Sequence, residues 1–250
     1  MTKITSTLLS ASVALSLLSS LSMAKESNAH WGYTGHGSPA SWGEISPKYK
    51  MCGMGKNQSP INITTSLDAD LAAIDPEYTS ATNEILNNGH TVQVNVEAGS
   101  TLKVDGITFE LKQFHFHTPS ENHINGKSFP LEAHFVHADK DGNLAVLALM
   151  FEEGEENKVL SKVWKKMPKA ANEKGVLKLS DISAALLPKN KDYYRFNGSL
   201  TTPPCSEGVR WLVLKTPVSV SKAQVEAFSH TMHHPNNRPI QATNARMIVK

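Results

Sequence analysis

The pattern of apolar and polar positions predicts β-strands over much of the chain from residue 84 onward. In residues 90–97 (HTVQVNVE), valines alternate with polar residues, as in a strand with one buried face. Residues 101–117 contain Asp105-Gly106, a strong two-residue turn signal, so this stretch predicts a β-hairpin. Residues 131–139 (LEAHFVHAD) predict another short strand.

The remaining apolar stretches predict two more strands and two helices. Residues 144–151 (LAVLALMF) form an unbroken apolar run, which suits a strand buried on both faces in mid-sheet, and residues 209–220 (VRWLVLKTPVSV) predict a further strand. Apolar residues at helical spacing predict a helix in residues 155–167. Residues 221–232 open on a Ser and Gln in capping-box positions and predict a second helix. The pattern indicates one mainly β (α+β) domain with a few peripheral helices.

Composition and charge are those of an ordinary globular domain. The chain of 250 residues suits one large domain, with 40% hydrophobic and 19% charged residues. A formal net charge of +2 indicates neither a nucleic-acid partner nor a basic membrane patch, and we expect the lysines to be scattered over a solvated surface.

The first 24 residues predict a secretory signal peptide. Lys3 precedes an apolar run, and Ser22-Met23-Ala24 forms a small-x-small cleavage site. The run is interrupted by serines and is short for a transmembrane span. We expect cleavage after Ala24, leaving a mature domain of residues 25–250 with no membrane segment. The protein is then exported, to the periplasm of a Gram-negative host and otherwise to the medium.

Export changes the interpretation of the two cysteines. Cys52 and Cys205 are alone in the chain, and in an oxidising compartment such a pair predicts a disulfide. Closing so long a loop stabilises a protein by about 4–5 kcal/mol in the chain-entropy model. Two buried free thiols are the alternative.

The segment QFHFHTPSENH raises the question of a metal site. In a strand ending at His117, side-chain alternation puts His115 and His117 on one face, about 6.5–7 Å apart at the backbone, close enough to share one metal ion. We expect this to be the face that carries Ile107, Phe109 and Leu111.

The neighbouring residues supply a third candidate ligand. The other face of the strand changes from polar to apolar at Phe114, so the strand is expected to enter the interior there and present its histidines to a cavity. If residues 131–139 pair with this strand, His134 completes a three-histidine site, which is a catalytic zinc pattern. Gln113 and Glu132 each precede a candidate ligand by two residues and are placed to orient its imidazole.

A zinc ion with three neutral ligands lowers the pKa of its bound water to about 7 and holds hydroxide at neutral pH. Thr201 and Thr202, before Pro203-Pro204, are candidates to orient the hydroxide, with Glu121 as the carboxylate behind them. The histidine spacing alone leaves a second interpretation open, that of surface histidines without a metal.

Seven segments together resemble the α-class carbonic anhydrases, particularly exported bacterial members. In chain order they are HWGY, QSPINI, NNGH, QFHFH, ENH, LEAHFVH and GSLTTPPCSEGVRW, from His30 to near the C-terminus. The resemblance implies a central, mostly antiparallel twisted sheet of about ten strands, with an active-site cone reaching its centre. It also implies cis bonds at Ser59-Pro60 and Pro203-Pro204, and it is compatible with a homodimer.

The resemblance assigns roles to individual residues. The zinc ligands are His115, His117 and His134, supported by Gln113 and Glu132. The catalytic residues are Thr201, which orients the hydroxide, its partner carboxylate Glu121, and the proton shuttle His90. The segment TPSENH, which contains Glu121, is shorter than in animal members of the family.

The resemblance also assigns the walls of the active-site cone. The hydrophobic wall where carbon dioxide rests comprises Val136, Val146, Leu200, Val209 and Trp211. The hydrophilic side comprises Thr202, which also belongs to the substrate-binding residues, and the water-ordering Asn88 and Tyr33. Cys52 and Cys205 correspond to the cysteine pair of bacterial members.

The implied function is reversible hydration of carbon dioxide to bicarbonate and a proton. One alternative is a carbonic anhydrase-like binding domain without activity. Another is a cupin-type metal oxygenase, since HFHTPSE fits H-x-H-x3-E, although the second cupin motif is absent. Five further histidines are expected outside the site: His123 and His137 in structural roles, and His230, His233 and His234 on the surface.

Overall fold

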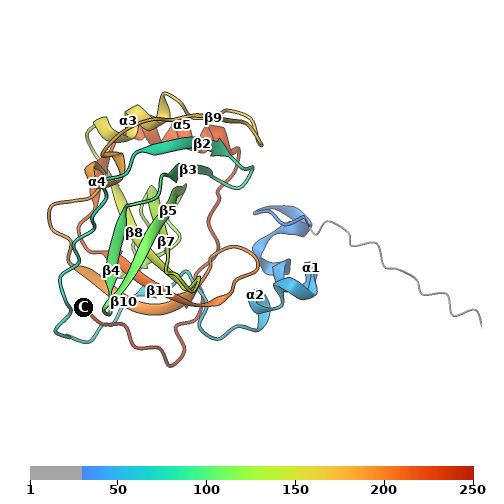
Figure 1. The fold of residues 1–250 in the computed structure, drawn as a ribbon. Helices are drawn as coiled ribbons and strands as arrows, with labels where there is room; N and C mark the ends of the chain where they lie inside the picture. The colour runs from blue at the N-terminus through green and yellow to red at the C-terminus, as the bar shows by residue number, and fades with distance from the viewer. Residues whose placement is uncertain (1–29) are drawn as a thin grey trace, which may run out of the picture.

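The computed structural model describes residues 30–250, so the predicted signal peptide lies outside the described residues. Ten strands form one sheet (Figure 1). They are β2 (Thr82–Asn87), β3 (Val92–Val96), β4 (Thr101–Val104), β5 (Ile107–His117), β7 (Leu131–Ala138), β8 (Leu144–Glu153), β9 (Lys174–Val176), β10 (Tyr193–Ser199), β11 (Glu207–Leu214) and β12 (Val218–Val220). A separate two-stranded sheet pairs β1 (Asn62–Ile63) with β6 (His123–Ile124).

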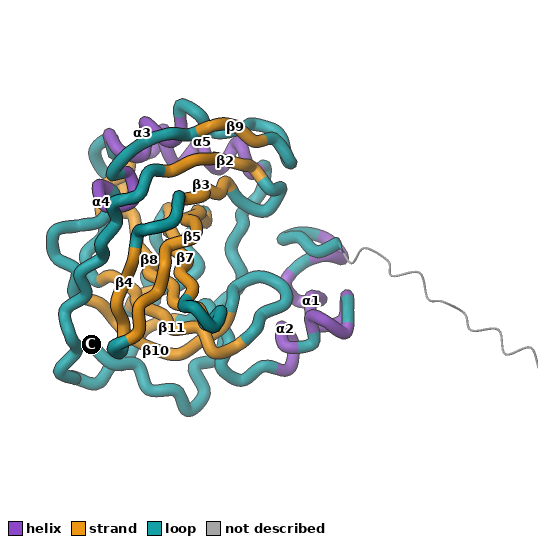
Figure 2. Tube along the Cα trace, in the orientation of Figure 1, coloured by secondary structure: helices purple, strands orange, loops and turns teal. Residues whose placement is uncertain are grey.

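The order across the large sheet is β10-β11-β8-β7-β5-β3-β2-β9, with β12 beside β8 and β4 beside β5. Paired strands are antiparallel, except that β8 runs parallel to β11 and β12. Short helices lie around the sheet (Figure 2). They are α1 (Trp42–Ile45), α2 (Met51–Met54), α3 (Lys158–Trp164), α4 (Ile182–Ala185) and α5 (Lys222–Met232). The predicted mainly β domain of about ten strands is confirmed.

Local sequence signals account for several of these elements. The hairpin of β4 and β5 turns at Asp105 and Gly106, whose φ angles of 53° and 76° are those of a left-handed two-residue turn. Helix α5 begins with the predicted capping box between Ser221 and Gln224. β8 lies between β7 and β11 and is buried from residue 145 to 151, as its unbroken apolar run predicts.

The prediction of a single strand over residues 209–220 is wrong. The stretch 209–220 forms two strands, because Pro217 has no N–H to continue a ladder. Both of these strands pair with β8, at different points along it. Strand β10 was not predicted at all, because its buried and exposed residues do not alternate.

A bulge in β5 overturns the predicted face of the histidines. The pairing with β7 shifts between Leu111 and Gln113, so Lys112 has no opposite residue and the direction of successive side chains reverses there. Leu111 therefore packs in the same core cluster as Phe114, on the side away from the histidines. The expectation that the histidines share a face with Ile107, Phe109 and Leu111 is wrong.

The sheet has an apolar cluster on each face. One cluster lies between the sheet and the helices, and contains Leu160 of α3 and Phe228 of α5. The other contains alternate residues of β8, such as Val146, together with Trp211 of β11. Among residues 30–250, no helix has both the length and the apolar character needed to cross a membrane.

The predicted disulfide joins Cys52 in α2 to Cys205 in the loop before β11, across 153 residues of sequence. The peptide bonds before Pro60 and Pro204 are cis, as the family resemblance implies, and so is the bond before Pro119.

We expect Cys205→Ser to lower the free energy of unfolding by about 2–5 kcal/mol, because the cross-link restricts the unfolded chain. Urea denaturation measures this loss. A reductant should destabilise the wild type to a similar extent and leave the variant unchanged. The prediction would be contradicted if the wild type and Cys205→Ser had the same free energy of unfolding without reductant and reductant changed neither.

His137 gives the fold a dependence on pH. It is fully buried between the Tyr78 hydroxyl, 2.7 Å from Nε2, and the Ala145 carbonyl, 3.2 Å from Nδ1. Burial lowers the pKa of His137 to about 4, below its ordinary value of 6.5. Because the unfolded chain takes up the proton first, stability falls as the pH drops from 6.5 and levels off below about 4.

This single group therefore accounts for roughly 3 kcal/mol of acid destabilisation, at about 1.4 kcal/mol per unit of pKa. In urea denaturation between pH 7 and about pH 4, we expect His137→Gln to flatten the dependence of stability on pH. Tyr78→Phe should lower stability at every pH but keep the slope, because burial is the largest cause of the lowered pKa. Identical slopes for the wild type and His137→Gln would show that His137 does not titrate in this way.

Candidate metal centre

Three histidines converge where β5 and β7 pair. His115 stands directly opposite His134 in the antiparallel register, and His117 follows on the same face of β5. One nitrogen from each of the three rings lies within 4.8 Å of the others. The ring centroids are 5.1 Å apart for His115 and His117, and 4.6 Å apart for His117 and His134. Residues remote in sequence thus present three ligand atoms to one point.

A hydrogen bond fixes the outer nitrogen of each ring. Nδ1 of His115 lies 2.8 Å from Oε1 of Gln113, and Nε2 of His134 lies 2.8 Å from Oε1 of Glu132. Both partners were predicted from their position two residues before a ligand. The hydrogen bonds leave Nε2 of His115 and Nδ1 of His134 available to a metal ion.

The partner of His117 was not predicted. Nδ1 of His117 donates to the backbone carbonyl of Asn236 at 2.7 Å. The Asn236 side chain holds the same region together, because its Oδ1 accepts from the Thr118 N–H at 2.8 Å and its Nδ2 donates to the Phe116 carbonyl at 2.9 Å. A backbone acceptor carries no side-chain signal, so sequence motifs gave no means of finding it.

The three rings fit a zinc ion. Burial lowers the pKa of each imidazole below that of an ordinary histidine, and the neighbouring His117 lowers those of His115 and His134 further. All three rings are therefore neutral at pH 7, as zinc ligands must be. Nε2 of His117 is buried without a hydrogen-bond partner, which suits an atom that binds a metal. Three imidazoles also leave a fourth tetrahedral position open.

Glu132 connects the ligands to the loop after β5. Its Oε2 accepts from the backbone N–H groups of Glu121 at 2.7 Å and of Asn122 at 2.9 Å, while its Oε1 accepts from the Asn122 side chain at 2.8 Å. The carboxylate that holds His134 therefore also fixes the position of Glu121.

Glu121 is buried beside the histidines. Its Oε1 accepts from the Arg238 N–H at 2.8 Å, and its Oε2 lies 3.5 Å from Nε2 of His117 and 3.9 Å from Nδ1 of His134. Burial raises the pKa of Glu121 well above its ordinary value, opposed by hydrogen bonds from the Arg238 backbone and the Thr201 side chain. The predicted Thr201 and Glu121 are thus neighbours, although Oε2 has no partner at full hydrogen-bond geometry.

The predicted apolar residues form one wall next to the ligands. Val146, Val209 and Trp211 are buried in one cluster, and two half-buried residues pack against it, Val136 and Leu200. The Trp211 ring meets the His134 ring edge-on, with centroids 4.9 Å apart. Thr202, beside this wall, is half-buried and its carbonyl accepts from the Cys205 N–H at 2.8 Å.

A cavity of about 550 Å³ is lined by residues that include His90, Asn88 and Tyr33. The His90 ring stacks on Trp31, with centroids 3.7 Å apart and planes 9° apart. Oδ1 of Asn88 accepts from the His90 N–H at 2.9 Å and so fixes its backbone. Partial burial lowers the pKa of His90, and the nearby His30 and His234 lower it further.

The position of His234 corrects one expectation. His234 lines the same cavity as His90, although it was expected on the surface outside the site. His230 and His233 are exposed, as predicted. His123 lies in β6 and is not one of the three grouped ligands, and His137 is buried in the core.

The fold and this site define a class: a β-sheet protein in which three histidines are grouped as in a catalytic metal site. The family described as eukaryotic-type carbonic anhydrase matches residues 37–250. The chain belongs to the α-carbonic anhydrase family.

Its relatives are similar over nearly their whole length. A carbonic anhydrase of Pectobacterium atrosepticum is 52% identical over 238 residues, covering 95% of this chain and 98% of the relative. A carbonic anhydrase of Neisseria gonorrhoeae is 51% identical over 226 residues, covering 89% of this chain and 88% of the relative. The solved α-carbonic anhydrase of Thermovibrio ammonificans, in complex with the inhibitor sulfanilamide, superposes with a TM-score of 0.87 at 51% identity, covering 90% of this chain and all of that one.

Proposed function

We propose that this carbonic anhydrase catalyses the reversible hydration of carbon dioxide to bicarbonate and a proton at a zinc ion held by His115, His117 and His134. The observation that carries the proposal is the convergence of three neutral imidazoles, of which those of His117 and His134 are buried, with Nε2 of His117 left unpartnered. When bound by three neutral ligands, zinc lowers the pKa of a water molecule to about 7 and so provides a nucleophile at neutral pH.

Thr201 and Glu121 orient the nucleophile. Oε1 of Glu121 is occupied by the Arg238 N–H, so the other oxygen is available to the Thr201 hydroxyl. A hydroxyl that donates its only proton to a carboxylate can only accept from the nucleophile. The hydrogen bond from the nucleophile to Thr201 therefore orients the nucleophile, so that one of its lone pairs points toward the substrate.

The apolar wall holds carbon dioxide, which has no charge and little need of hydrogen bonds. Val146, Val209 and Trp211 present buried apolar surface beside His134. Such a surface binds the substrate weakly and releases the charged product, because bicarbonate is better solvated in water than against apolar side chains.

His90 moves the proton between the site and solvent. Its ring lines the cavity with Asn88 and Tyr33, which are placed to order the intervening water. Because partial burial lowers the pKa of His90 below that of an ordinary histidine, its ring is a neutral proton acceptor at pH 7 and can pass the proton on to buffer.

The two alternatives receive less support. An inactive binding domain has no need of the three histidines, Thr201, Glu121 and His90 together, and all of them are present. A cupin oxygenase does not accord with a chain that matches the carbonic anhydrase family over residues 37–250.

We also propose that the protein works outside the cytoplasm. The support is the N-terminal signal pattern and the disulfide between Cys52 and Cys205, a bond that persists in oxidising compartments. In a Gram-negative host the compartment is the periplasm.

Stopped-flow measurement of carbon dioxide hydration tests the proposed function directly. The purified protein should contain one zinc ion per chain by metal analysis, lose its activity on removal of the metal, and regain it when zinc is returned. A hydration rate that is equal with and without zinc would refute the proposal.

A further inference from the structure

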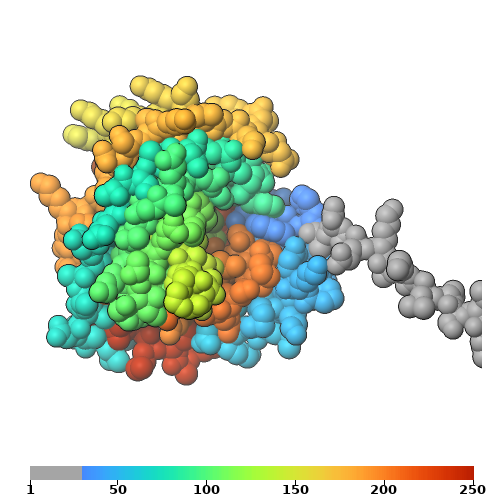
Figure 3. Space-filling view, viewed as in Figure 1, coloured from blue at the N-terminus to red at the C-terminus, as the bar shows by residue number. Residues whose placement is uncertain are grey.

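A groove beside α3 is lined by lysines and apolar residues, with no acidic side chain. We call it the lysine groove; its volume is about 270 Å³, and its lining residues are Lys162, Lys165, Lys166, Val176, Leu177, Lys178 and Leu179. The four lysines are exposed, and none forms an ion pair within the described part of the chain. The two stretches of chain that form the groove lie along the upper edge of the molecule, in yellow and light orange (Figure 3).

The fold brings two separate stretches of sequence together in this groove. In α3, Leu160 and Val163 are buried against the core, so Lys162 faces outward. Residues 177–179 are fixed to the sheet by Thr82, whose hydroxyl donates to the Leu177 carbonyl at 2.7 Å and accepts from the Leu179 N–H at 3.2 Å. These bonds hold Lys178 beside the helix.

A purely structural role accounts for only part of the cluster. Cations at a helix C-terminus interact favourably with its free carbonyls, which explains Lys165 and Lys166. It does not explain Lys178, which belongs to another segment, or Val176, which is 68% exposed between the lysines. Like charges gathered without an acidic partner repel one another, and an external anion relieves that repulsion.

We propose that the lysine groove docks the protein on an anionic phospholipid surface. Lysine is a strongly hydrated point charge that acts on a diffuse layer of charge, whereas site-specific phosphate recognition favours the fork of arginine, and the groove has no arginine. Val176 is placed to enter the interface while the lysines remain at the headgroups. The net charge of +2 gives no indication of this basic surface, because a net charge does not show how the charges are distributed over the molecule.

The same segment reaches the cavity that His90 lines. Between α3 and β9, Ala171 and Asn172 line the cavity that contains His90, and the Asn172 N–H donates to the Asn87 carbonyl at 2.7 Å. Docking therefore brings the rim of that cavity near the bilayer that carbon dioxide crosses. This consequence rests on the proposed function, whereas the docking itself does not.

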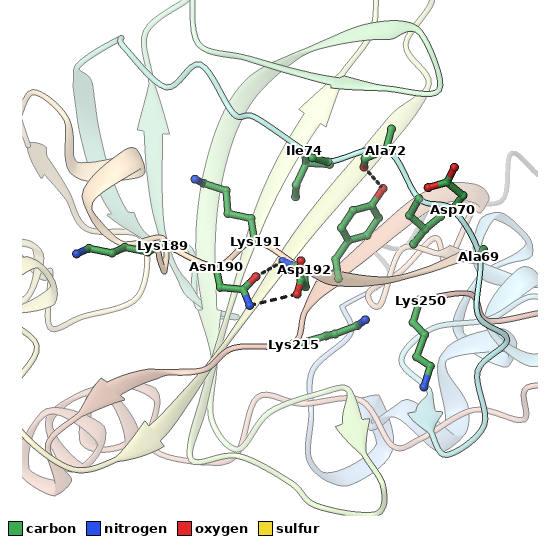
Figure 4. A pocket seen from close by; sticks show the side chains of 13 residues that line it. Ala69, Asp70, Ala72, Ile74, Lys189, Asn190, Lys191, Asp192, Lys215 and Lys250 are labelled. Atoms are coloured by element: carbon green, nitrogen blue, oxygen red, sulfur yellow. Dashed lines mark hydrogen bonds between the residues drawn. The ribbon is translucent and has the colours of Figure 1, made fainter.

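A second lysine cluster offers a matched control. Lys189, Lys191 and Lys215 line another cavity, but Asp70 and Asp192 line it too. In Figure 4, Asp192 lies among the labelled residues, hydrogen-bonded to Asn190, while Lys189 and Lys191 extend away from Lys215. These lysines therefore share their cavity with two carboxylates, and Lys189 and Lys191 do not converge with Lys215.

The test is co-sedimentation of the purified protein with vesicles of equal parts phosphatidylglycerol and phosphatidylcholine. We expect the triple variant Lys162→Glu/Lys166→Glu/Lys178→Glu to bind at least about 100-fold more weakly, since each lysine near an anionic bilayer contributes about fivefold. The triple variant Lys189→Glu/Lys191→Glu/Lys215→Glu has the same net charge and should lose less than about threefold. Circular dichroism and carbon dioxide hydration without vesicles verify that both variants are folded.

Each of three results would overturn the proposal. The first is equal binding to vesicles of phosphatidylcholine alone, and the second is an equal loss in the two triple variants. The third is complete displacement by millimolar inorganic phosphate at constant ionic strength, which would identify free phosphate as the ligand. Since binding is measured without catalysis, failure here is distinguishable from failure of the proposed function.

Discussion

Replacing His117 by alanine is expected to remove both the bound zinc and the hydration of carbon dioxide. We expect kcat/KM to fall by at least about three orders of magnitude, because loss of an outer hydrogen-bond partner alone costs about 10–100-fold and a ligand contributes more. We chose His117 because its Nδ1 donates to the Asn236 carbonyl, while its Nε2 is buried without a hydrogen-bond partner and so is available to the metal. Zinc content and stopped-flow rates measure the two effects.

His123→Ala is the matched control, because this histidine lies six residues further on, is half-buried in β6 and is not one of the grouped ligands. It should retain zinc and most of the activity. A His117→Ala protein that keeps a full complement of zinc and its rate would refute the assignment of His117. Thermal unfolding of both variants distinguishes loss of the metal from loss of the fold.

Replacing His90 by alanine is expected to lower kcat by about 100-fold while leaving kcat/KM for carbon dioxide nearly unchanged. The reason for the split is that His90 lines a cavity in which none of the three ligands lies, and its ring stacks on Trp31. It acts on the proton after the substrate has reacted, so binding and attack remain intact. Steady-state kinetics in a weak buffer separate the two parameters.

Imidazole buffer should restore much of the lost rate, since it replaces the missing proton acceptor. The wild-type kcat should fall on acidification through a pKa below 6.5, because the pKa of His90 is lowered and a protonated ring accepts no further proton. His230→Ala, an exposed histidine on α5, serves as the control and should change neither parameter. Equal losses in kcat and kcat/KM would mean that His90 is not a proton shuttle.

Much of the fold and of the metal centre could be predicted from the sequence. Alternating valines, the Asp105-Gly106 turn and the Ser221 capping box depend on residues close in the chain, so their structures could be predicted locally. The positions of Gln113 and Glu132, two residues before their histidines, likewise follow from strand geometry.

The missed features lack such a local signal. Strand β10 has no alternation because its residues meet different surroundings along its length, including a register shift after Gly198. The change from polar to apolar at Phe114 coincides with the bulge in β5, but from the sequence alone the same change also predicts a strand that simply enters the interior. A bulge and a strand that enters the interior can both produce such a change of polarity. Only the pairing of β5 with β7 distinguishes the two.

The sequence indicated the class of chemistry through seven matching segments taken together, because the spacing of His115 and His117 alone is also compatible with surface histidines. The contacts that position the ligands and line the cavity become visible only in the folded structure. The Asn236 carbonyl reaches His117 across 119 positions, His234 joins the cavity of His90, and Lys178 lies beside Lys162. These contacts arise when distant segments pack on opposite faces and edges of one sheet, and no periodicity along the chain encodes them.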